Sequence, residues 1–232
     1  MLKIAGEKAG IIKAKTPVVS APQLPDAEKV IRARAAECEA PLQFVTEAYG
    51  KSPIALRGEH QKLNAAIAIA AIGAANIDIN GAAITRGLAT VEWPGRFQCW
   101  DKRTVIDGAH NQAAAEVLAA TWREIFGDER ATLILAVLSD KDLRGICAAL
   151  APIADLVLLP KIRSERAVDP AELSKIVIDL GCKSEVFSSF ADALAKARKQ
   201  EDPTLITGSL HFAGEALVHL QGKPAAFEEC AQ

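Results

Sequence analysis

The stretch WPGRFQCWDKRTVIDGAHN, residues 93–111, decides how the rest of the chain is interpreted. Phe97 and Cys99 alternate with Gln98 and Trp100, and this period of two predicts a half-buried strand. Residues 104–106, TVI, predict a second and more buried strand, and the segment DGAHN follows directly at its carboxyl end. In open α/β sheets the carboxyl ends of the strands are where ligands bind, so a site is expected here.

Two side chains of this segment have the chemistry of a nucleotide site. Asp107 can accept hydrogen bonds from two ribose hydroxyls, and His110, three residues further on, can reach a phosphate or a base. A plainer interpretation is that Asp107 caps the next helix and that His110 is a surface turn residue. The spacing alone leaves both interpretations open.

Composition limits the class of protein. The chain has 232 residues, half of them hydrophobic, which allows one large or two small domains. A net charge of -2 argues against a nucleic-acid partner held by a basic face. The longest apolar run, residues 65–72, is too short to span a bilayer, and the amino terminus has no apolar signal segment. Five scattered cysteines without a CxxC pair predict neither a disulfide framework nor a metal site, and we expect a cytoplasmic protein.

The first 95 residues predict a mixture of short strands and helices. Asp26 is expected to cap a helix that runs to about residue 38. A helix that begins near His60 and continues through AAIAIAAIGAA is apolar nearly all round, so it is expected to be buried. The other predicted elements are strands at 16–20, 42–46 and 54–56, a helix at 80–91 and a hinge at 93–95.

After Arg96 strands and helices alternate regularly, which predicts βαβ units and a parallel sheet. Asn111 is expected to cap a helix that Gly127 ends, and Asp169-Pro170 is expected to open another that Gly181 ends. Strands are predicted at 132–138, 155–159, 184–187 and 204–207, and further helices at 142–150, 190–199 and 212–220.

Five stretches of the chain, in order, resemble one family. They are GEKAGIIK (6–13), RGEHQKLNAAIA (57–68), WPGRFQ…DGAHN (93–111), LSDKD (138–142) and TGSLHFAGE (207–215). Together they are similar to the bifunctional folylpolyglutamate synthase/dihydrofolate synthase family, a branch of the Mur-ligase-like amide ligases.

The resemblance implies an α/β fold in two parts. Residues 1–95 would be the remnant of a P-loop ATPase domain and residues 96–222 a Rossmann-like, glutamate-binding carboxyl-terminal domain, with a tail at 223–232. One feature of the family is missing, because no G-x-x-x-x-G-K-[ST] occurs in the sequence. The chain therefore looks like the distal half of such a ligase, and alone we expect it to be inactive.

The resemblance also implies a reaction. Such ligases use ATP and Mg²⁺ to phosphorylate a carboxylate, and the amino group of L-glutamate then attacks the acyl phosphate to form an amide. The acceptor would be a folate, dihydropteroate or both. Small-molecule substrates, no nucleic acid, no membrane and a monomeric full-length enzyme are expected.

By the same resemblance, particular residues receive roles. Asn64 would contact the adenine, Arg96 the phosphate and ribose, Asp107 the ribose hydroxyls, and His110 would lie near the α-phosphate. His60 would orient its neighbours. Lys141 and Ser209, at carboxyl ends of strands, would bind the α-carboxylate of glutamate.

Lys8 in EKAG matches the position where the family carries a carbamylated lysine. A carbamate is an anion with oxygen ligands and would suit a second Mg²⁺. In this chain, without the phosphate-binding loop, we expect Lys8 to be exposed and unmodified.

Two alternatives remain open. One is a Mur-type ligase of peptidoglycan synthesis, against which the HQ at 60–61 and GSLHF at 208–212 count. The other is a non-catalytic module that binds a nucleotide or a partner, which the missing phosphate-binding loop favours for this chain as it stands.

Overall fold

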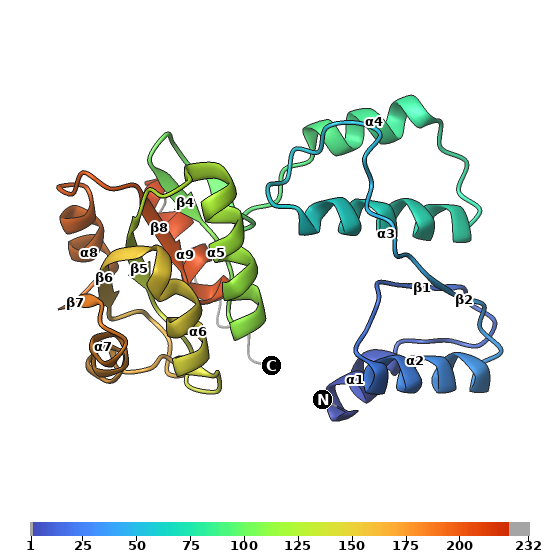
Figure 1. The fold of residues 1–232 in the computed structure, drawn as a ribbon, viewed down its shortest axis with the longest axis horizontal. Helices are drawn as coiled ribbons and strands as arrows, with labels where there is room; N and C mark the ends of the chain where they lie inside the picture. The colour runs from blue at the N-terminus through green and yellow to red at the C-terminus, as the bar shows by residue number, and fades with distance from the viewer. Residues whose placement is uncertain (1, 223–232) are drawn as a thin grey trace. The chain divides into compact units, whose positions relative to one another are not determined.

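The computed structural model of the chain describes residues 2–222, so the predicted tail at 223–232 lies outside the described residues. The chain divides into two compact units between Glu92 and Trp93 (Figure 1). The predicted domain boundary lay three residues further on, between 95 and 96.

Unit 1 combines four helices with a two-stranded parallel sheet, in which Val18 pairs with Leu42. Its small core consists of Ala9, Ile12, Ala35 and Ala40. Its elements are α1 (Leu2–Ala9), β1 (Val18–Ser20), α2 (Pro25–Glu37), β2 (Leu42–Phe44), α3 (His60–Ala74) and α4 (Gly81–Thr90).

Several predictions for unit 1 are wrong. Residues 54–56 form no strand, because Ala55 donates its backbone hydrogen bond to Leu88 of α4 at 2.8 Å rather than to a neighbouring strand. The preceding Pro53 has no N–H to donate. α2 begins at Pro25 with Leu24 in the capping position, so Asp26 lies inside the helix, and α1 was not predicted.

α3 is also less buried than its apolar sequence predicts. Gln61 and Ala65 are its buried residues, while the remaining side chains are partly or fully exposed. Apolar content shows that a helix can be buried, but the elements that would cover it decide whether it is.

Unit 2 is a six-stranded sheet covered by helices on both faces. The strand order is β3-β4-β8-β5-β6-β7, and every neighbouring pair is parallel except β3 with β4. Its elements are β3 (Gln98–Cys99), β4 (Thr104–Ile106), α5 (Gln112–Phe126), β5 (Ala131–Leu135), α6 (Leu143–Leu150), the 3-10 turn η1 (Ala151–Ile153), β6 (Ala154–Pro160), α7 (Pro170–Asp179), β7 (Lys183–Phe187), α8 (Phe190–Ala197), β8 (Thr204–Thr207) and α9 (Leu210–Leu220).

Alternate residues of the strands supply two hydrophobic cores. Leu205 of β8 packs with α5, α6 and α7 on one face, and its neighbour Ile206 packs with α8 and α9 on the other. On the first face Trp122 is fully buried, donates its indole N–H to the carbonyl of Glu129 at 2.7 Å, and stacks on Phe126 with ring centroids 4.2 Å apart. The mixed α/β fold with a mainly parallel sheet confirms the predicted fold class.

The helix ends of unit 2 follow their predicted signals. The side chain of Asn111 accepts a hydrogen bond from the N–H of Ala114 at 2.8 Å, and Gly127 ends α5 with a φ of +62°. Asp169 caps α7, and Gly181 follows that helix with a φ of +81°. The caps are confirmed because they depend on neighbouring residues alone.

The alternation at residues 97–100 does not mark one inner face as predicted. Phe97 is buried but Cys99 is exposed, while Trp100 packs against the core of α8 and α9. The cause is local: Phe97 has a φ of +40°, outside the strand region, so the regular alternation begins only after it.

Candidate functional site

The carboxyl ends of β4, β8 and β5 form the centre of the candidate site, because β8 lies between the other two strands. The segments after these strands carry Asp107 and His110, Ser209, and Lys141 respectively. α5 and α6 leave this edge toward one face of the sheet, whereas α9 leaves toward the other. Such a divergence opens the crevice in which open α/β sheets bind ligands.

The carboxylate of Asp107 fixes the local backbone. Its Oδ2 accepts a hydrogen bond from the N–H of Phe97 and its Oδ1 from the N–H of Ala109, both at 2.8 Å. These bonds hold Phe97 at its positive φ, which costs free energy in a residue other than glycine. The cap of α5 is Asn111, so the interpretation of Asp107 as that cap is wrong.

Gly108 allows two side chains to close over the same turn. A β-carbon at this position would overlap Cδ2 of Leu210 and lie 3.2 Å from Nη1 of Arg96. The N–H of Gly108 also donates to the carbonyl of Gly95 at 2.8 Å. The guanidinium of Arg96 therefore lies close to the segment that carries Asp107.

His110 is half-buried at the start of α5. Its Nδ1 lies 3.0 Å from the carbonyl oxygen of Gly108. A carbonyl can only accept, so Nδ1 carries the proton and Nε2 is the acceptor nitrogen of the neutral ring. This bond orients the imidazole relative to the turn after β4.

Lys141 takes part in an ionic cluster in the segment after β5. Its Nζ donates to Asp140 Oδ2 at 2.7 Å, and Arg166 donates to Asp140 Oδ1 at 3.1 Å. The hydrogen bond from Lys141, followed by that from Arg166, holds the pKa of Asp140 below its ordinary value. Asp142 then caps α6 by accepting from the N–H of Gly145 at 2.9 Å.

Ser209 lies at the end of β8 and is almost completely buried, with 2% of its surface exposed. Its hydroxyl caps α9 by accepting from the N–H of Phe212 at 3.0 Å. The preceding Gly208 has a φ of +121°, and a β-carbon there would overlap the carbonyl oxygen of Ala136. The adjacent Thr207 is buried, and its hydroxyl has no hydrogen-bond partner within residues 2–222.

In unit 1 the predicted residues of α3 form a short hydrogen-bonded row. Asn64 donates to Gln61 Oε1 at 3.0 Å, and Gln61 Nε2 lies 3.0 Å from Nε2 of His60. Gln61 is buried, whereas Asn64 and His60 are exposed. Lys8 lies in the last turn of α1 and is exposed, which confirms the exposure predicted for it.

Five of the predicted site residues lie in the segments around one sheet edge. These residues are Arg96, Asp107, His110, Lys141 and Ser209. Lys8 and Asn64 belong to unit 1. Sequence reasoning did not find Gly108, Gly208, Asp140 or Gln61 as contributors. The available signal for the first two was a glycine within two residues of a strand end.

Comparison with known proteins decides the family. The pattern of the family described as Mur ligase, glutamate ligase domain matches residues 95–210, which is half of the chain and most of unit 2. The chain belongs to the Mur ligase family. The matched segment contains every predicted site residue of unit 2.

The relatives of this chain are named as dihydrofolate synthases and folylpolyglutamate synthases. The dihydrofolate synthase/folylpolyglutamate synthase of Bacillus subtilis is 30% identical over 90% of this chain, which covers 56% of that protein. The enzyme of the same name from Mycobacterium tuberculosis is 33% identical over 74% of the chain and 42% of its own length. The chain spans about half the length of the curated relatives it matches.

Solved structures give the same result. The chain matches the folylpolyglutamate synthase of M. tuberculosis, complexed with ADP and AMPPCP, with a TM-score of 0.81 and 30% identity. This match covers 96% of our chain and 60% of that structure. The folylpolyglutamate synthase of Thermotoga maritima matches with a TM-score of 0.76 and 25% identity over 96% of the chain and 58% of its own.

Two further observations concern the described residues as a whole. No helix within residues 2–222 combines the length and apolarity needed to cross a lipid bilayer. No group of three or more His, Cys, Asp or Glu side chains in this part of the chain is placed to hold a metal ion.

Proposed function

We propose that this chain belongs to an ATP-dependent ligase that adds L-glutamate to folates, to dihydropteroate or to both through an acyl phosphate. The observation that carries the proposal is the edge of unit 2 at which β4, β8 and β5 end, with Arg96, His110, Lys141 and Ser209 in or beside the segments that meet there. The names of the relatives, which are dihydrofolate and folylpolyglutamate synthases, support the substrate class. Because the chain spans about half of those proteins, the complete activity is inferred.

The residues after β4 are proposed to position the nucleotide. Both oxygens of Asp107 accept backbone hydrogen bonds, which fix the carboxylate, and a carboxylate is the kind of acceptor that ribose hydroxyls require. Arg96 lies beside this turn and supplies a cation for phosphate. His110 presents Nε2 as an acceptor when neutral and as a donor when protonated.

The residues after β5 and β8 are proposed to bind the incoming glutamate. Lys141 contributes a cation, and its contact with Asp140 keeps the ammonium group in one place. Ser209 contributes a hydroxyl whose oxygen is fixed by the cap of α9. In the reaction the glutamate nitrogen forms a bond to the acyl carbon, the bond from that carbon to the phosphate oxygen breaks, and phosphate leaves.

The fit of ATP and of Mg²⁺ differs. The exposed amide of Asn64 and the turn around Asp107 offer the hydrogen-bonding groups that adenine and ribose require. For Mg²⁺, no group of three or more His, Cys, Asp or Glu side chains is assembled within residues 2–222. Carbamylation of Lys8 in a complete enzyme remains a proposal that would supply one such ligand.

The chain as it stands supports a second candidate function. Its 232 residues contain no G-x-x-x-x-G-K-[ST], the loop whose backbone N–H groups hold the phosphates. We therefore propose that these residues alone hydrolyse no ATP and that any activity of this polypeptide by itself is limited to binding. The names of the relatives give no support to a peptidoglycan ligase.

The decisive experiment joins this chain to the part of the B. subtilis relative that it does not cover and measures folate-dependent phosphate release. Asp107→Ala should raise the KM for ATP, because hydrogen bonds to a charged group contribute about 1.5 to 3 kcal/mol. Lys141→Gln and Ser209→Ala should instead raise the KM for glutamate.

Lys175 is an exposed residue of α7 away from this edge, so Lys175→Gln should leave the KM for ATP and the KM for glutamate unchanged. Phosphate release by the unjoined 232-residue chain would contradict the proposed inactivity. If Asp107→Ala, Lys141→Gln and Ser209→Ala each changed the KM for ATP and the KM for glutamate equally, the assigned roles would be contradicted.

A further inference from the structure

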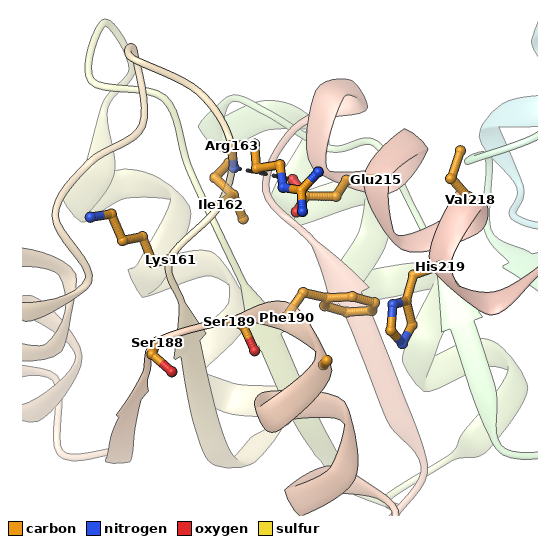
Figure 2. Close-up of a pocket in the computed structure, with 10 residues that line it drawn as sticks. Lys161, Ile162, Arg163, Ser188, Ser189, Phe190, Glu215, Val218 and His219 are labelled. Atoms are coloured by element: carbon orange, nitrogen blue, oxygen red, sulfur yellow. Dashed lines mark hydrogen bonds between the residues drawn. The ribbon is translucent and has the colours of Figure 1, made fainter. Parts of the chain in front are cut away.

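Unit 2 contains a cavity that the proposed ligase reaction does not use. It has a volume of about 660 Å³ and lies among α8, α9 and the segment that follows β6. Figure 2 shows its lining, with Arg163 and Glu215 on one side and Phe190 and His219 on the other. Small-molecule sites typically enclose about 300–1,000 Å³, so the volume suits a small ligand.

The topology of the sheet explains why a cavity forms here. β6 is followed by α7, which packs on one face, whereas its neighbour β7 is followed by α8 on the other face. The segments after these two strands therefore diverge, as they do around β8. This is a second switch point at the carboxyl edge, separated from β8 by β5 and β6.

The cavity wall is held in place by hydrogen bonds between distant parts of the chain. The N–H of Lys161 donates to the carbonyl of Phe187 at 2.9 Å. The carbonyl of Arg163 accepts from Nε2 of His211 at 3.1 Å, and the N–H of Arg163 donates to Glu215 Oε2 at 3.4 Å. The segment after β6 is thus tied both to the sheet and to α9, so the cavity exists before any ligand binds.

The lining separates charge from aromatic surface. The guanidinium of Arg163 and the carboxylate of Glu215 occupy one side, and neither takes part in an ion pair within 4.0 Å among the described residues (Figure 2). Opposite them the Phe190 ring meets His219 edge-on, with ring centroids 5.3 Å apart. Phe190 also contacts Phe212 edge-on at 5.5 Å, which fixes the position of its ring.

We propose that this cavity binds a zwitterionic small molecule with an aromatic side chain, of the class of aromatic α-amino acids. A carboxylate matches the planar donor group of Arg163, and an adjacent ammonium group matches the carboxylate of Glu215. The ligand ring would pack against Phe190 and His219, since aromatic rings favour edge-to-face and offset contacts. Glutamate suits this cavity poorly, because its side-chain carboxylate would face the aromatic rings of Phe190 and His219. The ligand proposed here therefore differs from the glutamate proposed for the other site.

A titration of the 232-residue protein with L-phenylalanine, followed by amide NMR shifts, tests the class of ligand. Saturable shifts are expected at 161–163, 188–191 and 215–219. Three analogues each lack one group: 3-phenylpropionate has no ammonium, 2-phenylethylamine no carboxylate and L-alanine no ring. Each should bind at least about tenfold more weakly, which corresponds to about 1.4 kcal/mol.

Substitutions then test the residues. Arg163→Gln and Glu215→Gln should each weaken L-phenylalanine about tenfold, while Lys175→Gln on the opposite face should bind as the unchanged protein does. Both substituted side chains lie on the cavity wall rather than in the core, and a preserved amide spectrum verifies the fold. Unchanged affinity in both variants, saturation by 3-phenylpropionate at equal affinity, or shifts confined to 107–111 and 208–209 would each overturn the proposal.

Discussion

Replacing Gly208 with alanine tests whether the end of β8 is as crowded as the structure shows. Gly208 has a φ of +121°, a region almost restricted to glycine, so alanine there costs about 1–3 kcal/mol in backbone strain. The new β-carbon would also overlap the carbonyl oxygen of Ala136 and lie 2.8 Å from its carbonyl carbon. Neither atom belongs to a flexible side chain, so the backbone must shift, at a further cost of about 1–3 kcal/mol.

Two other glycines of unit 2 separate these contributions. Gly127 has a φ of +62° but nothing within 4 Å of a β-carbon, so Gly127→Ala should show the backbone strain without the overlap. Gly214 lies inside α9 with no positive φ and no close atoms, so Gly214→Ala should stabilise the unit by about 0.5–1 kcal/mol. From most to least stable, the expected order is Gly214→Ala, the unchanged protein, Gly127→Ala and Gly208→Ala.

Tryptophan fluorescence during urea and thermal unfolding measures the effect in unit 2 alone, because Trp93, Trp100 and Trp122 all belong to it. A total loss of about 4 kcal/mol for Gly208→Ala should lower the melting temperature by roughly 10 °C. The reasoning fails if Gly208→Ala loses no more stability than Gly127→Ala, since the overlap with Ala136 would then cost nothing.

Three further predictions use the same protein or its extended form. Asn111→Ala should destabilise unit 2 by about 1 kcal/mol in urea unfolding because it removes the cap of α5, and Asn111→Asp should keep most of that stability. Burial, and secondarily the nearby Cys182, raises the pKa of Cys147 from 9.0 to about 11. The neutral thiol is therefore favoured in the folded state, so its stabilising contribution is complete below pH 9 and is lost as the pH rises toward 11. Cys147→Ala should flatten the stability profile in that window, and an identical profile would disprove the assignment. Mass spectrometry should find Lys8 unmodified in this chain, whereas in the joined ligase Lys8→Ala should abolish activity with partial rescue by short carboxylic acids; full activity without rescue would make Lys8 an ordinary surface lysine.

Local signals in the sequence predicted much of unit 2. Asn111, Asp169, Gly127 and Gly181 mark helix ends through their own side chains or backbone freedom, so neighbouring residues suffice to recognise them. The order of the strands could not be predicted in this way. The position of β8 between β4 and β5 depends on packing between residues far apart in the chain.

The candidate site shows the same division. Asp107 and His110 were predicted because they follow a strand directly, and this position is visible in the sequence. The need for glycine at 108 and 208 could not be predicted from the sequence. The atoms that crowd those positions belong to Leu210 and Ala136, and their proximity appears only in the folded structure. The prediction that α3 is buried failed for a related reason, because the sequence of a helix does not reveal which elements cover it.

The central place of β8 also constrains how the chain reaches its folded state. β8 is the last strand within residues 2–222, yet Thr104 of β4 and Thr132 of β5 both pair with Thr204. During synthesis on the ribosome β4 and β5 therefore emerge with one edge each unpaired, and these edges stay open until β8 has been made. Pairing across such separations slows folding, so nascent chains of unit 2 are expected to need protection from association for most of their synthesis.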